Sequence, residues 1–139
     1  MAGYSGTPLP QKLGIKSGAR LALLGAPAGF LTLLAALPSG VKPLQLNRAK
    51  GAFDVVVAFF LREAAFVARL PRLHAALEPN AGLWIAWPKR ASGVATDMTE
   101  DVVRRHALPR GLVDNKVCAI DATWSALRLV IRLGNRPRG

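Results

Sequence analysis

Cysteine is almost absent from this sequence, which contains Cys118 and no other. A single cysteine excludes an internal disulfide, and the two histidines, His74 and His106, are too isolated to form a Cys/His metal-binding motif. The sequence therefore predicts no metal site and a protein of the reducing cytoplasm. Its first six residues also lack the charged and then apolar layout of a signal peptide.

Acidic residues are scarce as well, with 8 against 19 basic ones and a formal net charge of +11. Asp54 is the first acid of the chain, and every charged residue before it is basic. Charge of this sign favours polyanionic partners such as nucleic acid, an acidic membrane surface or phosphorylated ligands. A solvated, arginine-rich surface without a partner explains the same charge equally well, so both interpretations stay open.

The chain also lacks a convincing membrane-spanning segment. The most apolar stretch runs from Leu21 to Pro38 and is only just long enough for a span, with Thr32 as its one clearly polar residue. Gly25, Pro27 and Gly29 lie near its centre, where they would break a helix. We therefore expect no membrane span.

Apolar segments typical of β-strands alternate along the chain with segments in which apolar residues recur at the spacing of a helix. This order predicts one α/β Rossmann-like three-layer domain, with a mainly parallel sheet of about six strands that ends in an antiparallel hairpin. Strands are expected at residues 20–25, 41–46, 53–60, 83–87, 112–120 and 124–133, and helices at 28–37, 62–77 and from 97 to 106–108. The domain would cover residues 13–133, between an extended N-terminal arm (1–12) and a basic disordered tail (134–139).

Several local signals refine this prediction. Pro43 favours an edge position for its strand, and Pro71 predicts a kink or two short helices within 62–77. Residues 78–82 contain proline, asparagine and glycine and are typical of a turn. Asp97 is expected to cap the helix that follows it, with Glu100 at the reciprocal position of a capping box.

Three segments resemble parts of the class I S-adenosylmethionine-dependent methyltransferases. Residues 13–20 resemble the approach to the first strand of that fold, 53–57 its fourth strand, and 77–85 a helix end, proline–glycine turn and fifth strand. The closing hairpin fits its last two strands. The resemblance implies a shortened methyltransferase fold, with S-adenosylmethionine as its cofactor.

A closer resemblance is to a small uncharacterised bacterial family, the domain of unknown function three-zero-five-two. It rests on stretches that extend over nearly the whole chain: Gly3–Leu9, Lys12–Lys16, Gly82–Lys89, Ser92–Gly93, Thr96–Asp97 and Val117–Asp121. This family name implies no activity.

The sequence departs from the methyltransferase pattern at three places. The loop Gly25–Gly29 has proline at its middle position, where the missing N–H and fixed φ hinder close approach of a cofactor. Only Gln45 or Asn47 could replace the acid that would hold the ribose hydroxyls, and apolar Phe59 and Phe60 precede Arg62 where a polar catalytic motif is common. S-adenosylmethionine and methyl transfer are therefore disfavoured.

No other catalytic constellation is present. Neither Ser92 nor Ser125 has a nucleophile signature around it, and Cys118 in an apolar strand is typical of an inert core residue. Trp84 and Trp87 are expected to pack on opposite faces of their sheet. We predict no catalytic residue.

A ligand would nevertheless bind where parallel strands end, at the carboxyl edge of the sheet. Segments 25–29, 60–62 and 88–97 should meet there and offer glycine backbone, basic side chains and a helix N-terminus to an anionic group. The predicted ligand-binding residues are Gly25, Pro27, Gly29, Arg62, Lys89, Arg90, Ser92, Gly93, Thr96 and Asp97. A solvated basic loop is the alternative interpretation of the last segment.

Three functions follow from these observations. The first is a non-catalytic binding or interaction module on a methyltransferase-like fold, with a small anionic ligand. The second is a basic protein associated with nucleic acid, although no aromatic RNA motif or helix-turn-helix pattern is visible. The third is an active S-adenosylmethionine-dependent methyltransferase.

Overall fold

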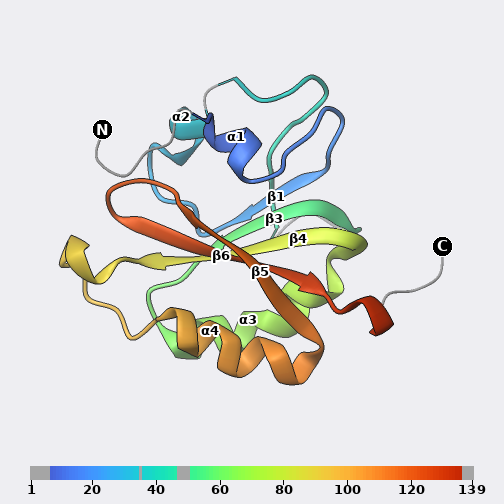
Figure 1. Cartoon of the computed structure of the whole chain (residues 1–139). Coiled ribbons are helices and arrows are strands. Elements are labelled where there is room, and N and C mark those ends of the chain that lie inside the picture. The colour runs from blue at the N-terminus through green and yellow to red at the C-terminus, as the bar shows by residue number, and fades with distance from the viewer. Residues whose placement is uncertain (1–6, 35, 47–50, 136–139) are drawn as a thin grey trace.

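The computed structural model describes residues 7–34, 36–46 and 51–135, which form a single α/β domain. Figure 1 shows a central sheet with helices on both faces. Six strands form this sheet in the order β2-β1-β3-β4-β6-β5. The elements in chain order are α1 (Leu9–Lys12), β1 (Leu21–Leu24), α2 (Phe30–Leu34), β2 (Leu44–Gln45), β3 (Phe53–Phe59), α3 (Glu63–Ala75), β4 (Leu77–Pro88), α4 (Glu100–Ala107), β5 (Leu112–Ala119) and β6 (Trp124–Ile131).

The first four strands are parallel, and β3, the most apolar of them, lies between β1 and β4. Its branched and aromatic side chains suit a strand that is buried on both faces. The two residues of β2 are exposed, and this strand lies at the edge of the sheet, where Pro43 predicted it. The carboxyl ends of β1, β3 and β4 are aligned, because Leu24 pairs with Ala58 and Phe59 pairs with Ala86.

The last two strands form the predicted antiparallel hairpin. β6 pairs antiparallel with both β4 and β5, which makes it the only reversed strand of the described sheet. The Asp121 carboxylate closes the turn, since its Oδ1 accepts hydrogen bonds from the backbone N–H groups of Thr123 (2.8 Å) and Trp124 (2.7 Å).

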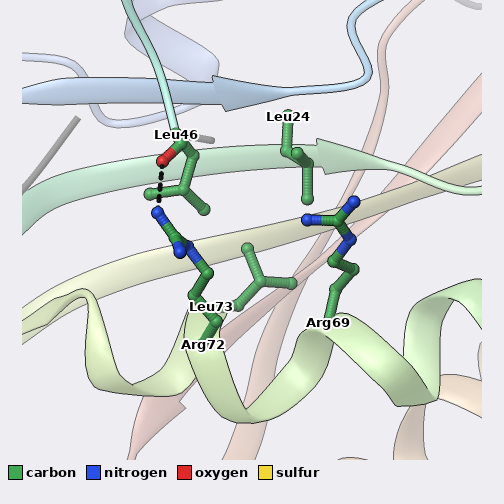
Figure 2. A pocket seen from close by; sticks show the side chains of 5 residues that line it. All are labelled: Leu24, Leu46, Arg69, Arg72 and Leu73. Atoms are coloured by element: carbon green, nitrogen blue, oxygen red, sulfur yellow. Dashed lines mark hydrogen bonds between the residues drawn. The ribbon is translucent and has the colours of Figure 1, made fainter. Parts of the chain in front are cut away.

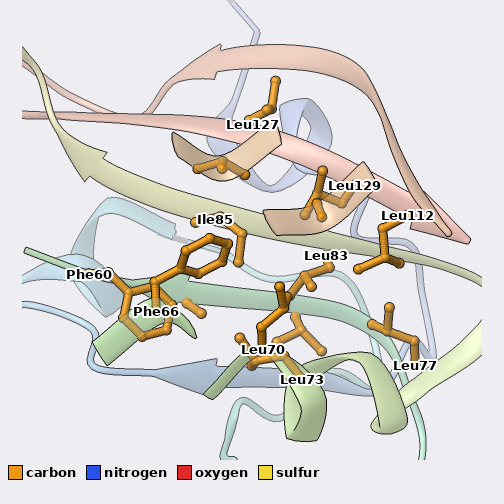
Figure 3. Close-up of a cluster of buried hydrophobic side chains, with 14 of the residues drawn as sticks. Phe60, Phe66, Leu70, Leu73, Leu77, Leu83, Ile85, Leu112, Leu127 and Leu129 are labelled. Carbon is orange, nitrogen blue, oxygen red and sulfur yellow. The ribbon is translucent and has the colours of Figure 1, made fainter. Parts of the chain in front are cut away.

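Two apolar clusters cover the two faces of the sheet. Phe66, Leu70 and Leu73 of α3 pack against the sheet on one face (Figure 3), in a cluster that also contains residues of α4. The helices α1 and α2 and the loops around them cover the other face. Trp84 belongs to this second cluster and Trp87 to the first, so the prediction that they pack on opposite faces is confirmed.

Four local predictions need correction. The arm expected to be extended forms the helix α1 in its described part, because Pro10 fits the first turn of a helix and is buried there. The tail expected from residue 134 begins within a short 3-10 helix, Leu133–Asn135. Residues 1–6 and 136–139, and the predicted basic turn at 47–50, lie outside the described residues.

The other two corrections concern prolines. Of the two outcomes predicted for Pro71, two short helices is wrong, because α3 is one helix. Pro71 lies on its exposed side, where a carbonyl without a helical partner can bond to water. Residues 78–82 form part of β4 rather than a turn. An irregularity in the pairing accommodates them, because β3 advances from Phe53 to Val55 while β4 advances from Leu77 to Gly82.

Candidate functional site

The carboxyl edge of the sheet brings the three predicted segments into one row. Strands in a sheet are separated by about 4.8 Å, so the ends of β1 and β4 lie about 10 Å apart on either side of β3. The loop that follows β3 is bonded directly to the loop that follows β4. The Thr96 hydroxyl donates a hydrogen bond to the Leu61 carbonyl at 2.6 Å, and the Asp97 N–H donates to the same oxygen at 3.3 Å.

The glycine loop after β1 is built around contacts within the protein. Gly25 and Gly29 have φ values of +67° and +86°, in the region that favours glycine. A Cβ on Gly25 would lie 3.1 Å from the Phe59 carbonyl oxygen, whereas one on Gly29 would meet no atom within 4 Å. The carbonyl of Pro27 accepts a hydrogen bond from the Phe30 N–H at 3.1 Å and thereby starts α2. Gly25 is thus required by the packing of β1 against β3.

Aromatic side chains fill one face of this edge. The ring of Phe59, at the end of β3, makes edge-to-face contacts with Phe30 at 4.9 Å and with Trp124 at 5.1 Å between ring centroids. Phe59 is only 6% exposed. These rings place apolar packing at the end of β3, where the sequence lacks the polar motif of an active methyltransferase.

Three of the predicted polar ligands form hydrogen bonds with backbone groups of the protein. The Ser92 hydroxyl donates to the Lys89 carbonyl at 2.6 Å, and Thr96 holds Leu61 as described above. The Asp97 carboxylate accepts a hydrogen bond from the Glu63 N–H at 2.6 Å, which satisfies a free donor in the first turn of α3. These groups fix the loop between β4 and α4 against the start of α3.

The capping prediction for α4 was wrong. Thr99, and not Asp97, is the N-cap of α4, and its hydroxyl accepts a hydrogen bond from the Val102 N–H at 3.1 Å. Glu100 pairs with Arg104 one turn later at 2.8 Å instead of bonding back to the cap. Asp97 lies two residues before the N-cap of α4, and its carboxylate caps α3 instead.

A hollow of about 440 Å³ opens at the end of β4. Trp87, Pro88 and Met98 are buried at its apolar side, and the exposed guanidinium of Arg90 makes no ion pair or hydrogen bond with any described residue. Gly93, with φ +76°, leaves its backbone uncovered. The full lining is Trp87, Pro88, Arg90, Gly93, Val94, Ala95, Thr96, Met98, Thr99 and Glu100.

Of the ten predicted residues, only Arg90, Gly93 and Thr96 line the hollow, and Ser92 and Asp97 belong to the same loop without lining it. Gly25, Pro27 and Gly29 lie two strands away, Arg62 is the exposed N-cap of α3, and half-buried Lys89 precedes the hollow. The sequence did not single out Met98, Val94 or Thr99 as site residues. The buried apolar side of the hollow depends on where the loop between β4 and α4 folds back. No sequence motif indicates that point.

Two basic side chains of α3 lie near the ends of β1 and β2, where the sequence comparison with methyltransferases looks for an acid. Figure 2 shows Arg72 of α3 reaching to Leu46, whose carbonyl accepts its hydrogen bond at 3.1 Å, with Arg69 beside Leu24. The narrow gap between these side chains leaves no space for a water-sized molecule. Gln45 is exposed, and Asn47 lies outside the described residues. This edge therefore lacks a carboxylate for ribose hydroxyls within its described part.

Neither a scan of protein-family models nor a search of curated proteins finds a match to this chain. Solved structures do match. The ribosomal protein L11 methylase from Lactobacillus delbrueckii subsp. bulgaricus is similar with a TM-score of 0.61 and 12% identity, over 88% of this chain and 74% of that chain. The magnesium protoporphyrin IX methyltransferase from Synechocystis PCC 6803 with bound SAM is similar with a TM-score of 0.57 and 9% identity, over 86% and 73%.

A third similar structure is the DhpI–SAH complex, with a TM-score of 0.58 and 11% identity, over 91% of this chain and 83% of that chain. At these identities the likeness establishes the fold. The chain has the Rossmann-like fold of class I methyltransferases, as the sequence predicted. The resemblance to the family three-zero-five-two stays a prediction.

No group of three or more histidine, cysteine, aspartate or glutamate side chains in the described part of the chain is placed to hold a metal ion. Among the described helices, none combines the length and the apolar character that a bilayer crossing requires.

Cys118 is buried, and this burial raises the pKa of its thiol, against a smaller opposing effect of nearby Lys12.

Substitution of Asp97 tests whether this residue supports the fold. We expect Asp97→Ala to lower the free energy of unfolding by about 1 kcal/mol, because the Glu63 N–H loses its acceptor. Asp97→Asn keeps an acceptor oxygen and should retain most of that stability. Urea unfolding followed by circular dichroism measures both, and equal losses in the two variants would contradict the capping role.

Proposed function

We propose that this protein is a non-catalytic binding module that uses a methyltransferase-like sheet to hold a small anionic ligand. The hollow at the end of β4 supports this proposal most directly. It places the unpaired Arg90 guanidinium above a buried apolar side, at the edge of the sheet where ligands of this fold class bind. Such a lining suits a ligand with one anionic group and a flat apolar body.

The hydroxyl and carboxylate groups around the hollow favour binding over chemistry. Ser92, Thr96, Asp97 and Thr99 each bond to a backbone group of their own loop, of the loop after β3 or of a neighbouring helix. A catalytic base or nucleophile must reach a substrate proton or atom, and a side chain that is engaged in this way would first have to give up its bond. The one acid in the lining, Glu100, is paired with Arg104.

The glycine loop supports the same preference. In this chain Gly25 accommodates the Phe59 carbonyl, and Pro27 contributes no N–H to a cofactor. The similar structures with bound SAM or SAH make S-adenosyl compounds the natural competing ligands. A nucleoside monophosphate such as AMP shares their adenosine group and adds the phosphate that Arg90 would bind.

Calorimetric titration with AMP tests this proposal. The wild-type protein should bind AMP, and Arg90→Ala should weaken that binding about ten-fold through loss of a charged hydrogen bond. Arg132→Ala removes the same charge from an exposed residue just after β6 and is the matched control, for which we expect unchanged binding. Equal weakening by both variants would show that net charge alone explains the weaker binding, and it would contradict a site at the hollow.

A further inference from the structure

A second hollow lies at the opposite edge of the sheet, where the parallel strands begin. It has a volume of about 330 Å³. Its lining comes from the loop before β1, the starts of β3 and β4, and one residue of β6. The residues are Gly14, Lys16, Ser17, Gly18, Ala19, Asp54, Val55, Asn80 and Arg128. Most of these are polar, charged or backbone-exposing residues, which distinguishes this hollow from the more apolar one at the end of β4.

The fold fixes the loop that forms one wall of this hollow. Leu13 and Ile15 are buried in the second apolar cluster, and the Leu13 carbonyl accepts a hydrogen bond from the Trp84 indole N–H at 3.0 Å. The Gly18 N–H donates to the Ser39 carbonyl at 2.8 Å. With both ends held, the exposed Lys16 and Ser17 stand at the rim. Neither side chain has a hydrogen bond or ion pair with a described residue.

Arg128 supplies a second cation from the floor of the hollow. Its guanidinium lies across Gly82, where an added Cβ would be 2.5 Å from Nε, so only glycine allows this placement. Nη1 also donates to the Asn115 side chain at 3.3 Å. The glycine therefore leaves room for the guanidinium beside β4, and Asn115 gives it one hydrogen-bond partner there.

Asp54 adds an acceptor beside the two cations. Its Oδ2 accepts the Arg20 N–H at 2.9 Å, while Oδ1 has no partner among the described residues. Lys16 forms no ion pair with Asp54 within the salt-bridge distance. The hollow thus combines an excess of positive charge with one carboxylate oxygen that can accept a hydrogen bond from a hydroxyl group.

From this arrangement we infer that the hollow is a second binding site, for a small phosphorylated metabolite that also carries hydroxyl groups. Lys16 and Arg128 bind the phosphate oxygens, since cationic donors form the strongest hydrogen bonds to such anions. Asp54 accepts a hydrogen bond from a hydroxyl of the same ligand. The volume lies at the lower end of the range for small-molecule sites. This inference does not depend on the proposed function of the carboxyl edge.

Titration calorimetry with ribose 5-phosphate tests the second site. The wild-type protein should bind this probe more tightly than inorganic phosphate, and ribose alone should not bind. Lys16→Ala should weaken ribose 5-phosphate about ten-fold, and Lys16→Arg should restore most of the affinity. Lys16 is exposed, so neither variant should disturb folding. Arg110→Ala, an exposed arginine after α4, is the control for net charge.

Two comparisons decide the outcome. Asp54→Asn keeps the acceptor for the Arg20 N–H, and should remove the advantage of ribose 5-phosphate over inorganic phosphate. Arg90→Ala alters the other edge of the sheet and should leave this binding unchanged. The inference is overturned if the wild-type protein shows no saturable binding of ribose 5-phosphate, if Lys16→Ala binds it as well as Arg110→Ala does, or if Arg90→Ala abolishes it.

Discussion

Replacement of Trp84 by alanine should lower the free energy of unfolding by about 3–5 kcal/mol, the largest single effect expected in this protein. Trp84 is 0% exposed at the centre of β4 and is the largest fully buried side chain. Its removal leaves a cavity beneath α1 and α2 and deprives the Leu13 carbonyl of its indole donor. Since whole domains are stable by only about 5–15 kcal/mol, the variant should be close to unfolding.

Trp84→Phe separates packing from hydrogen bonding. Phenylalanine fills much of the same space and lacks the N–H, so we expect a loss of about 1–2 kcal/mol. Urea unfolding followed by far-ultraviolet circular dichroism measures both variants without relying on tryptophan fluorescence. A loss below about 1 kcal/mol for Trp84→Ala would contradict the central position of this side chain in the second apolar cluster.

Replacement of Gly25 by valine should lower the free energy of unfolding by about 3 kcal/mol, because two penalties coincide. A branched residue is strained at φ +67°, and its Cβ would press on the Phe59 carbonyl oxygen at 3.1 Å. That oxygen belongs to the backbone of β3, so it cannot move aside as a flexible side chain would.

Gly29→Val is the matched control for this prediction. Gly29 has φ +86° but open space around it, so its variant should show the conformational strain alone, about 1–2 kcal/mol. Thermal unfolding of the two variants gives the difference. If Gly25→Val is no less stable than Gly29→Val, the contact with Phe59 does not explain why glycine follows β1.

The sequence predicted the sheet well because strand signals here are local. The apolar run Phe53–Phe59 and the alternating faces of Trp84 and Trp87 identify buried strands without knowledge of their neighbours. Residues 78–82 were misassigned because proline, asparagine and glycine suggest a turn, whereas the pairing of β4 with β3 tolerates an irregular insertion. That tolerance depends on the partner strand and leaves no trace in the segment itself.

The edge of the sheet at which the three loops lie was predicted correctly, but the contacts within these loops were not. The register of parallel strands requires the loops after β1, β3 and β4 to share one edge, and they do. Asp97 was assigned to the nearer helix because capping signals are read along the chain. Its actual partner is Glu63, 34 residues earlier, at the start of α3. Partners at such separations follow from the packing of loops, which composition and spacing do not specify.

The structure sharpens the role of the glycine loop that resembles a cofactor loop. Gly25 is explained by the approach of Phe59, and basic Arg69 and Arg72 stand near the ends of β1 and β2. Both observations support the proposal that a sheet with the methyltransferase fold binds its ligand at the hollow beyond β4. The proposal of a non-catalytic module rests on the same two observations.

Nuclear magnetic resonance titration of the labelled protein tests this account most directly, because it locates a ligand residue by residue. AMP and S-adenosylhomocysteine are added separately, and the backbone amide shifts are followed. The account predicts saturable AMP-dependent shifts in Arg90–Thr96, and no saturable shifts of the Gly25, Ala28 and Gly29 amides with S-adenosylhomocysteine. Saturable shifts of those glycine-loop amides with S-adenosylhomocysteine, and none in Arg90–Thr96 with AMP, would contradict it.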